Sequence, residues 1–224
     1  MAEENNSFDI VSFGKEIKEA LQGRYEVKES QNLREMQNKS AQDTVFVFAT
    51  TISVCIDSNN FKSPIEYAIV VKAVMDVMRD NKNCNDIKSI DGNIIAVIDT
   101  PFTSDIDSAL DSVGKINAIF NILNKQHRIQ GLPSVNKGIG MCYGKILYQA
   151  GINAYNNIWI GPVVEDVLRF SREAISEGTR VFANFAIYNN LKDDYKNLFE
   201  KTTNDRYVAY PVNIAMNNWI DSNM

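Results

Sequence analysis

The sequence predicts an α+β fold in which helices cover a mainly antiparallel sheet. Residues 45–56, VFVFATTISVCI, form a β-branched and aromatic run that is long enough for a buried strand. Apolar residues recur at helical spacing after Pro64 and again after Ser104. Two apolar runs flank the pair Asp91 and Gly92, which indicates a hairpin. The predicted order is β-α-β-β-α-β-β-α-β.

The first 43 residues are predicted to be separate from a compact body of residues 44–224. Apolar residues between Ser7 and Leu21 follow a helical stripe. Residues 28–43 are almost wholly polar, so they have little apolar area with which to order themselves. We therefore expect an N-terminal helix and a polar linker over residues 1–43.

Within the body, each remaining element has its own local signal. Pro64 suits the first turn of a helix over residues 64–78, and a second helix is expected over 105–124. Residues 135–151 indicate a strand, a glycine-containing turn and a second strand. A short strand before Gly161 then leads into a helix. Later strands and helix starts are expected in TRVFANFAIYNNL and YVAYPVNIAM.

Composition excludes several classes of function. The net charge is −5 with a sequence pI of about 5.0, so a broad basic surface for nucleic acid is not expected. Three cysteines without a CxxC pair indicate reduced thiols rather than a disulfide framework. No long apolar window and no basic, apolar leader is visible, so we expect no membrane span and a cytoplasmic location.

Several strings, in this order and spacing, resemble the class III nucleotide cyclase domain over roughly residues 45–220. They are the 45–56 strand, KSIDGNIIAVIDTP, SDIDSALDSVGKINAIFNILN, KGIGMCYGK and WIGPVVEDVLRFS. The string DTPFTSDIDSA and the ending VNIAMNNWI are most similar to the bacterial pyrimidine nucleotide cyclases of the Pycsar antiphage systems. The resemblance implies a ferredoxin-like palm domain and a role in antiphage defence.

The resemblance also implies two Mg²⁺ or Mn²⁺ ions held by two aspartates. In the family pattern F-x-D, the first aspartate corresponds to Thr50, whose hydroxyl brings no charge. The second corresponds to Gly92, and Asp91 stands one residue early, on the opposite strand face in that register. Asp91 is equally an ordinary hairpin-turn residue. The candidate metal ligands are therefore Asp91, Thr50 and Asp57.

Two further family patterns point to substrate contacts. In G-x-x-V-N-x-x-x-[RK], Glu165 replaces the ribose-orienting Asn, and Arg169 keeps the charge-stabilising basic residue. Arg169 could instead be a surface cation that pairs with Glu165 along a helix. Purine-specific relatives read the base with a Lys and an Asp or Thr, which correspond here to Lys88 and Ile158. Ile158 cannot read a base edge, which argues against a purine substrate. Lys88 could also be a solvated strand-end residue.

These substitutions favour a catalytically degenerate pseudo-cyclase that binds a nucleotide or a protein partner. The alternative is an active enzyme that converts CTP or UTP into cCMP or cUMP with Mg²⁺ or Mn²⁺. The expected ligand is a nucleoside triphosphate or a cyclic nucleotide. The family implies a homodimer, or a heterodimer with an active cyclase to which this chain contributes Arg169.

Two other residues draw attention. His127 is the one histidine of the chain and is expected at a helix exit, in solvent or against the helix C-terminus. Trp159 is expected to pack against a helix rather than to act as a stacking platform.

Overall fold

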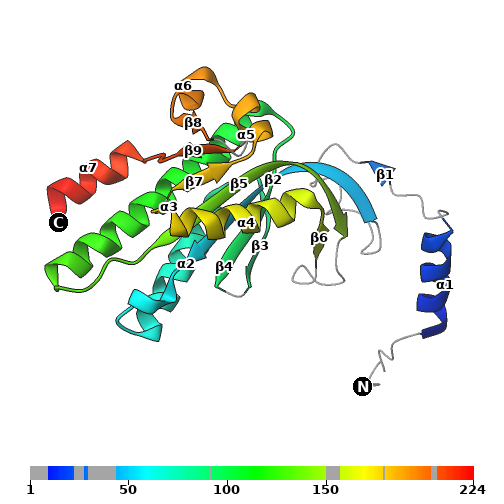
Figure 1. Ribbon diagram of the computed structural model, residues 1–224, viewed down its shortest axis with the longest axis horizontal. Coiled ribbons are helices and arrows are strands. Elements are labelled where there is room, and N and C mark those ends of the chain that lie inside the picture. Colours follow the sequence, from blue (N-terminus) through cyan, green and yellow to red (C-terminus); the bar gives the residue numbers. More distant parts are fainter. Residues whose placement is uncertain are drawn as a thin grey trace.

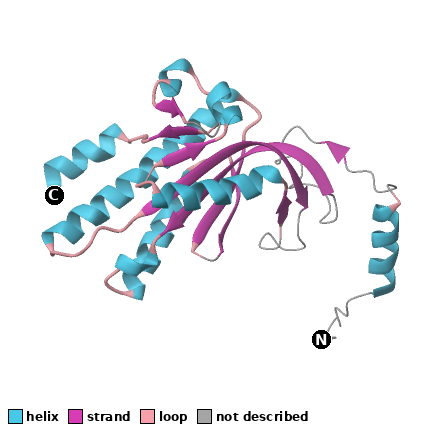
Figure 2. Ribbon diagram, viewed as in Figure 1, coloured by secondary structure: helices cyan, strands magenta, loops and turns pink. Residues whose placement is uncertain are grey.

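The structure is a computed structural model of the chain. It describes residues 10–22, 28–29, 44–90, 92–149, 157–178, 180–202 and 206–224. In this part of the chain nine strands form one sheet, whose main path has the order β3-β4-β2-β5-β7-β9-β8. The strand β1 pairs with β2, and β6 pairs with β5, beside this path. Figures 1 and 2 show the sheet with helices on both of its faces.

The strands are β1 Lys28–Glu29, β2 Thr44–Ile56, β3 Cys84–Ile90, β4 Asn93–Asp99, β5 Lys137–Gln149, β6 Ile158–Ile160, β7 Val181–Ala183, β8 Phe199–Lys201 and β9 Tyr207–Ala209. The helices are α1 Ile10–Leu21, the 3₁₀ helix η1 Ser58–Asn60, α2 Pro64–Asp80, α3 Thr103–Ile129, α4 Pro162–Ser176, α5 Phe185–Asn190, α6 Asp193–Lys196 and α7 Ile214–Asn223. The β1–β2 and β5–β7 pairs are parallel, and the other described pairs are antiparallel. The predicted α+β class with a mainly antiparallel sheet is therefore confirmed.

The elements with strong local signals were predicted correctly. The β-branched run became β2, and the two apolar stripes became α2 and α3. Ser63 caps α2 by accepting the Glu66 N–H at 3.2 Å, and Pro64 occupies the first helical turn. Ile90 pairs with Asn93, so the predicted hairpin is present, and Gly92 lies in its turn with φ 75°.

One prediction for the body was wrong. Residues 137–149 form one continuous strand, β5, instead of two strands joined by a glycine turn. The glycines serve close packing, because a Cβ on Gly138 would lie 2.0 Å from the Ser171 carbonyl oxygen, and one on Gly140 would lie 2.2 Å from the Val167 carbonyl oxygen. Removing the side chains lets α4 lie directly on β5.

At the N-terminal end, the predicted helix is present as α1. Most of the polar stretch 28–43 lies outside the described residues, but Lys28 and Glu29 form β1 beside Val45 and Phe46 of β2. The ion pair between Glu29 and Lys145 adds a contact from β1 to β5. None of the helices in the described ranges has the length and apolar character needed to cross a bilayer.

The core has two layers, one on each face of the sheet. On one face, α2 and α3 pack buried residues such as Val74 and Ile116 against Ile52 of β2. On the other face, α4 packs Val167 and neighbouring residues against β4 and β5 (Figure 1).

Candidate functional site

Asp57 directly follows β2, at the end of the sheet where the β3–β4 hairpin turns. The Ile56 N–H donates to the Gly92 carbonyl at 3.3 Å, and the Asp57 N–H donates to the Asn136 carbonyl at 3.0 Å. In register, Cys55 of β2 lies opposite Asn93 of β4. The end of β2, the hairpin turn and the start of β5 therefore meet at Asp57.

The Asp57 carboxylate is partly exposed and is held in place by its own turn. Its Oδ1 accepts the Asn59 N–H at 3.0 Å, which caps η1. Asp91, the other acid predicted for this region, lies outside the described residues. Its chain neighbours Ile90 and Gly92 are described, and both belong to the hairpin that adjoins the end of β2.

Thr50 lies elsewhere, in the interior of β2. It is fully buried, and its Oγ1 lies 3.0 Å from the Thr100 Oγ1, so the two hydroxyls share a hydrogen bond. Its strand partners are Ile98 and Tyr143, whereas Asp57 sits at the strand end. This placement does not favour Thr50 as a metal ligand. The polar run that follows Ile56 is the sequence signal that could have directed attention to Asp57 first.

The described part of the chain contains no cluster of three or more His, Cys, Asp or Glu side chains that could hold a metal ion. Asp57 nevertheless has the donor atoms and the accessible position that a ligand of a divalent cation needs. Its carboxylate is the hard oxygen ligand that Mg²⁺ and Mn²⁺ prefer, and it stands partly exposed at a strand end. The β3–β4 hairpin beside it carries a further acid in sequence, Asp91.

A second group of polar side chains joins β3 to β6. Lys88 donates a hydrogen bond to the Asn157 carbonyl, and its Nζ lies 4.7 Å from the Trp159 ring centroid. Asp86 accepts hydrogen bonds from Trp159 Nε1 at 2.9 Å and from Asn157 Nδ2 at 3.1 Å. We call these four residues the β3–β6 cluster. Its hydrogen bonds hold the segment before α4 against the hairpin strand.

The β3–β6 cluster changes the interpretation of the predicted base-reading pair. Lys88 is mostly buried and donates a hydrogen bond to the Asn157 carbonyl, so it is not a solvated residue at the end of a strand. Ile158 is half-exposed, while its neighbour Asn157 is buried and meets Lys88. Sequence reasoning missed Asn157 and Asp86, because a one-residue offset separates Asn157 from the family position. Trp159 packs beside Val163 and Val164 of α4, as predicted.

Arg169 and Glu165 lie on α4, and both are exposed. Arg169 donates to Asp166 at 2.6 Å and to Glu173 at 3.3 Å. These bonds, with the one to Asp166 foremost, raise the pKa of Arg169. The helical surface pairing considered for Arg169 is therefore present, but its partners are Asp166 and Glu173 instead of the expected Glu165.

The orientation of α4 keeps Arg169 apart from the end of β2. The helix turns Val167, Phe170 and Ala174 toward the sheet. Arg169 lies on the opposite side of the helix, because residues two positions apart point about 200° apart around its axis. The described contacts of Arg169 stay on its own helix and do not reach Asp57.

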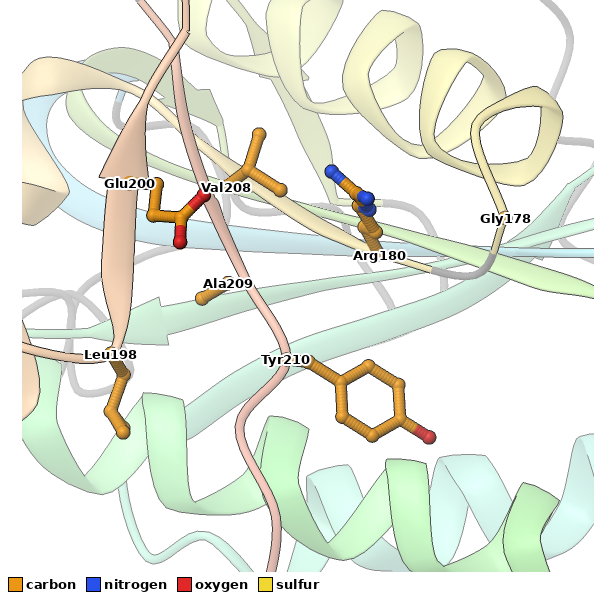
Figure 3. A pocket seen from close by; sticks show the side chains of 7 residues that line it. All are labelled: Gly178, Arg180, Leu198, Glu200, Val208, Ala209 and Tyr210. Carbon is orange, nitrogen blue, oxygen red and sulfur yellow. The ribbon is translucent and has the colours of Figure 1, made fainter.

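A separate cavity of about 450 Å³ lies at the other edge of the sheet (Figure 3). It is lined by Gly178, Arg180, Leu198, Glu200, Val208, Ala209 and Tyr210. None of the predicted site residues contributes to it, and its walls come from β8, β9 and the chain before β7. Its place in the fold separates it from the strand end at Asp57.

Comparison with known proteins adds to this geometry. No family model matches the sequence. The uridylate cyclase of Treponema porcinum is 23% identical over 161 residues, which cover 67% of this chain and 56% of that protein. The chain therefore matches little more than half the length of this curated relative.

Solved structures of similar fold include several cyclases. The adenylyl cyclase CyaB from P. aeruginosa has a TM-score of 0.59 at 12% identity, covering 77% of this chain and 98% of that one. The guanylyl cyclase Cya2 has a TM-score of 0.55 at 15% identity, covering 78% and 96%. A class III adenylyl cyclase-like ATP-binding protein from Pseudomonas aeruginosa has a TM-score of 0.60 at 11% identity, covering 93% and 48%. At these identities the likeness is one of fold.

Proposed function

The chain has the class III nucleotide cyclase fold, and on that premise we propose that it is a nucleotide cyclase for a pyrimidine nucleoside triphosphate. The observation that carries the proposal is the position of Asp57 beside the turn of the β3–β4 hairpin, where the Ile56 N–H donates to the Gly92 carbonyl. Asp91 precedes Gly92 in sequence. The prediction of a degenerate site rested on Thr50, on Gly92 and on Glu165, and the first of these is a buried residue that hydrogen-bonds Thr100. With Asp57 in that role, the chain retains two acids for one metal site.

In this proposal Asp57, together with Asp91, would hold the divalent cation. A Mg²⁺ or Mn²⁺ ion bound there would lower the pKa of the ribose 3′-hydroxyl and neutralise charge on the triphosphate. The chain's own part is to present the carboxylates. The backbone hydrogen bonds of Ile56 and Asp57 serve that purpose by fixing the strand end against both the hairpin and β5.

The β3–β6 cluster is proposed to receive the base. Asn157 brings an amide, which can both donate and accept, next to Lys88, which only donates. The Trp159 ring lies beside them, with its centroid 4.7 Å from the Lys88 Nζ. The similarity to a protein named uridylate cyclase supports a pyrimidine in this position.

Arg169 is proposed to act on the site of a second chain. It projects from the face of α4 that is turned away from the sheet, so it cannot reach Asp57 of its own chain without a rearrangement. A twofold homodimer would offer each Arg169 to the partner's strand end. Arg169 would then exchange its exposed pairs with Asp166 and Glu173 for triphosphate oxygens, which costs little because exposed ion pairs are weak.

A second candidate is a cyclase-like protein that binds nucleotide without turnover. Glu165 stands where relatives carry Asn, and Arg169 already has two carboxylate partners. Asp166 and Glu173, which pair with Arg169, and Glu165 one helical turn away would repel a triphosphate. One of the proteins of similar fold is described as an adenylyl cyclase-like ATP-binding protein.

The test uses purified full-length chain with CTP, UTP, ATP and GTP in the presence of Mn²⁺. Formation of cCMP or cUMP is expected, and Asp57→Asn is expected to lower the rate at least about 100-fold by removing a metal-binding charge. Asp194→Asn, an exposed exchange of the same kind on α6, is the matched control and should leave the rate unchanged.

Each result separates the candidates. Stabilisation of the fold by CTP or UTP without any cyclic product would favour the nucleotide-binding candidate. Full activity of Asp57→Asn would refute the metal assignment. The proposed role in antiphage defence needs a different experiment, in which bacteria that express the chain or Asp57→Asn are challenged with phage. Equal plating of phage on both would contradict that role.

A further inference from the structure

His127 forms a buried ion pair that reaches between two helices. It lies in the last turn of α3 and is 1% exposed. Its Nδ1 lies 2.7 Å from the Pro133 carbonyl oxygen, and its Nε2 lies 2.8 Å from Glu66 Oε1. Both partners are acceptors, so both ring nitrogens must donate and the imidazole is protonated. The predicted position at the end of a helix is confirmed, whereas the solvent alternative is wrong because α2 and the chain after α3 cover the ring.

The pKa shifts of the two side chains favour the charged pair. Burial lowers the pKa of His127, but the hydrogen bonds to Pro133 and Glu66 and the charge of Glu66 raise it more, so the net pKa is raised. Burial raises the pKa of Glu66, yet the bond to His127, the Lys62 N–H and the charges of His127 and Lys62 leave it lowered. The nearby Lys62 Nζ also donates to Gln130, and Arg128, next to His127 on α3, is exposed.

Two loops meet at this ion pair. One is the Asp57 loop, residues 57–63, between β2 and α2. The other is the β5 entry loop, residues 130–136, between α3 and β5. Figure 1 shows that the end of α3 and the start of α2 lie at the same end of the molecule, where these loops run.

The β5 entry loop holds the Asp57 loop through its carbonyl groups. The Asn136 carbonyl accepts the Asp57 N–H at 3.0 Å. The Ser134 carbonyl accepts Asn60 Nδ2 at 2.7 Å. His127 holds the Pro133 carbonyl of the same loop at 2.7 Å. The protonated ring therefore anchors the loop segment that in turn fixes the backbone of Asp57.

Glu66 anchors the far end of the Asp57 loop. Its Oε2 accepts the Lys62 N–H at 2.7 Å, while its Oε1 receives the His127 ring. Its own N–H donates to Ser63 Oγ at 3.2 Å, which caps the start of α2. One carboxylate thus connects the Asp57 loop to the histidine that holds the β5 entry loop.

We propose that His127 and Glu66 are positioning residues for the metal site at Asp57, and that loss of the His127 proton weakens divalent-cation binding there. The inference rests on the proposed function, because it assigns Asp57 as a metal ligand. A neutral imidazole has one N–H, so either the Pro133 carbonyl or Glu66 would lose its donor. The loop that carries Asp57 would then be held on one side only.

The direction of the pH effect follows from the raised pKa of His127. The ring loses its proton as pH rises through that raised value. Affinity for Mn²⁺ is therefore expected to fall on the alkaline side.

The experiment measures Mn²⁺ binding by calorimetry and cyclase activity as a function of Mn²⁺, both between pH 6 and pH 8.5. His127→Gln is expected to weaken Mn²⁺ binding roughly 10-fold, the scale found for groups that orient metal ligands. The rate at saturating Mn²⁺ should change much less. Asp80→Asn, which removes an exposed α2–α3 ion pair with Lys115, is the control and should leave Mn²⁺ binding unchanged.

Glu66→Gln keeps an acceptor for the ring but removes the negative charge. The pKa of His127 should fall, so the alkaline loss of Mn²⁺ affinity should move to lower pH. Glu66→Gln also tests the inference if His127→Gln does not fold.

Wild-type affinity that is independent of pH, or an unshifted profile in Glu66→Gln, would overturn the inference. Binding that Asp57→Asn abolishes and His127→Gln leaves intact would refute the positioning role and keep the proposed function. Absence of both Mn²⁺ binding and activity in the wild type would refute the proposed function itself.

Discussion

The packing of α4 on β5 can be tested by Gly140→Ala. A Cβ at this position would lie 2.2 Å from the Val167 carbonyl oxygen and 3.0 Å from the Ser171 N, whereas ordinary contact begins at 3.4 Å. Both obstacles belong to the backbone of α4 and cannot rotate away. The helix would have to move from the sheet by roughly 1 Å to make room.

The expected cost is about 3 kcal/mol. Overpacking a core typically costs about 1–3 kcal/mol. A gap of about 1 Å would also weaken the dispersion attraction between the sheet and the buried residues Val167, Phe170 and Ala174, which adds to the cost. Alanine recovers less than about 1 kcal/mol by restricting the unfolded chain. For a domain of this size, the melting temperature should fall by roughly 6–12 °C.

The measurement is thermal and urea denaturation of the wild type, Gly140→Ala and Gly144→Ala. Gly144 belongs to the same strand, but its Cβ would meet a side-chain atom, Val163 Cγ2, at 2.5 Å. A side chain can shift more easily than a helix backbone, so this control should lose about 1 kcal/mol. Wild-type stability in Gly140→Ala, or a greater loss in Gly144→Ala, would refute the reasoning.

Two further predictions concern buried polar groups. Burial lowers the pKa of Lys137 to about 8 from 10.5, so the stability of the wild type should rise with pH between these values, because the unfolded chain binds the proton more tightly. Lys137→Met should raise the free energy of unfolding at pH 7 by up to roughly 3 kcal/mol, and the melting temperature with it. The variant should no longer gain stability between pH 8 and pH 10.5. A lower melting temperature at pH 7 would contradict this reasoning. Trp159→Phe removes the donor to buried Asp86 and should cost about 1–3 kcal/mol in urea denaturation, whereas an unchanged midpoint would show that the bond is not needed.

Local signals in the sequence were sufficient for most of the fold. The β-branched run of β2, the apolar stripes of α2 and α3 and the hairpin turn at Gly92 each depend on neighbours within a few residues. Such patterns follow from backbone geometry, with a period of 2 for strands and 3.6 for helices. The glycines of β5 were misassigned because their reason, the closeness of α4, comes from a segment more than twenty residues further along the chain.

The site depended on contacts that no local pattern contains. Thr50 was assigned to the metal position by a short motif, but the place of a residue along β2 is set by its pairing with β4 and β5. That pairing puts Asp57, rather than Thr50, at the strand end beside the hairpin. Lys88 was found from the motif, while its partner Asn157 became visible only when β6 was placed next to β3.

By itself, the sequence determined the class of fold, those helices and strands that have strong local signals, and the set of acids and bases available for chemistry. Only the tertiary structure decided which of them meet. His127 shows the reason: its pattern indicated a helix end, but burial against Glu66 and Pro133 gives it a proton and a role, and those partners lie on separate segments. Periodicity reports the face of one element, whereas a site is formed by several elements packed together.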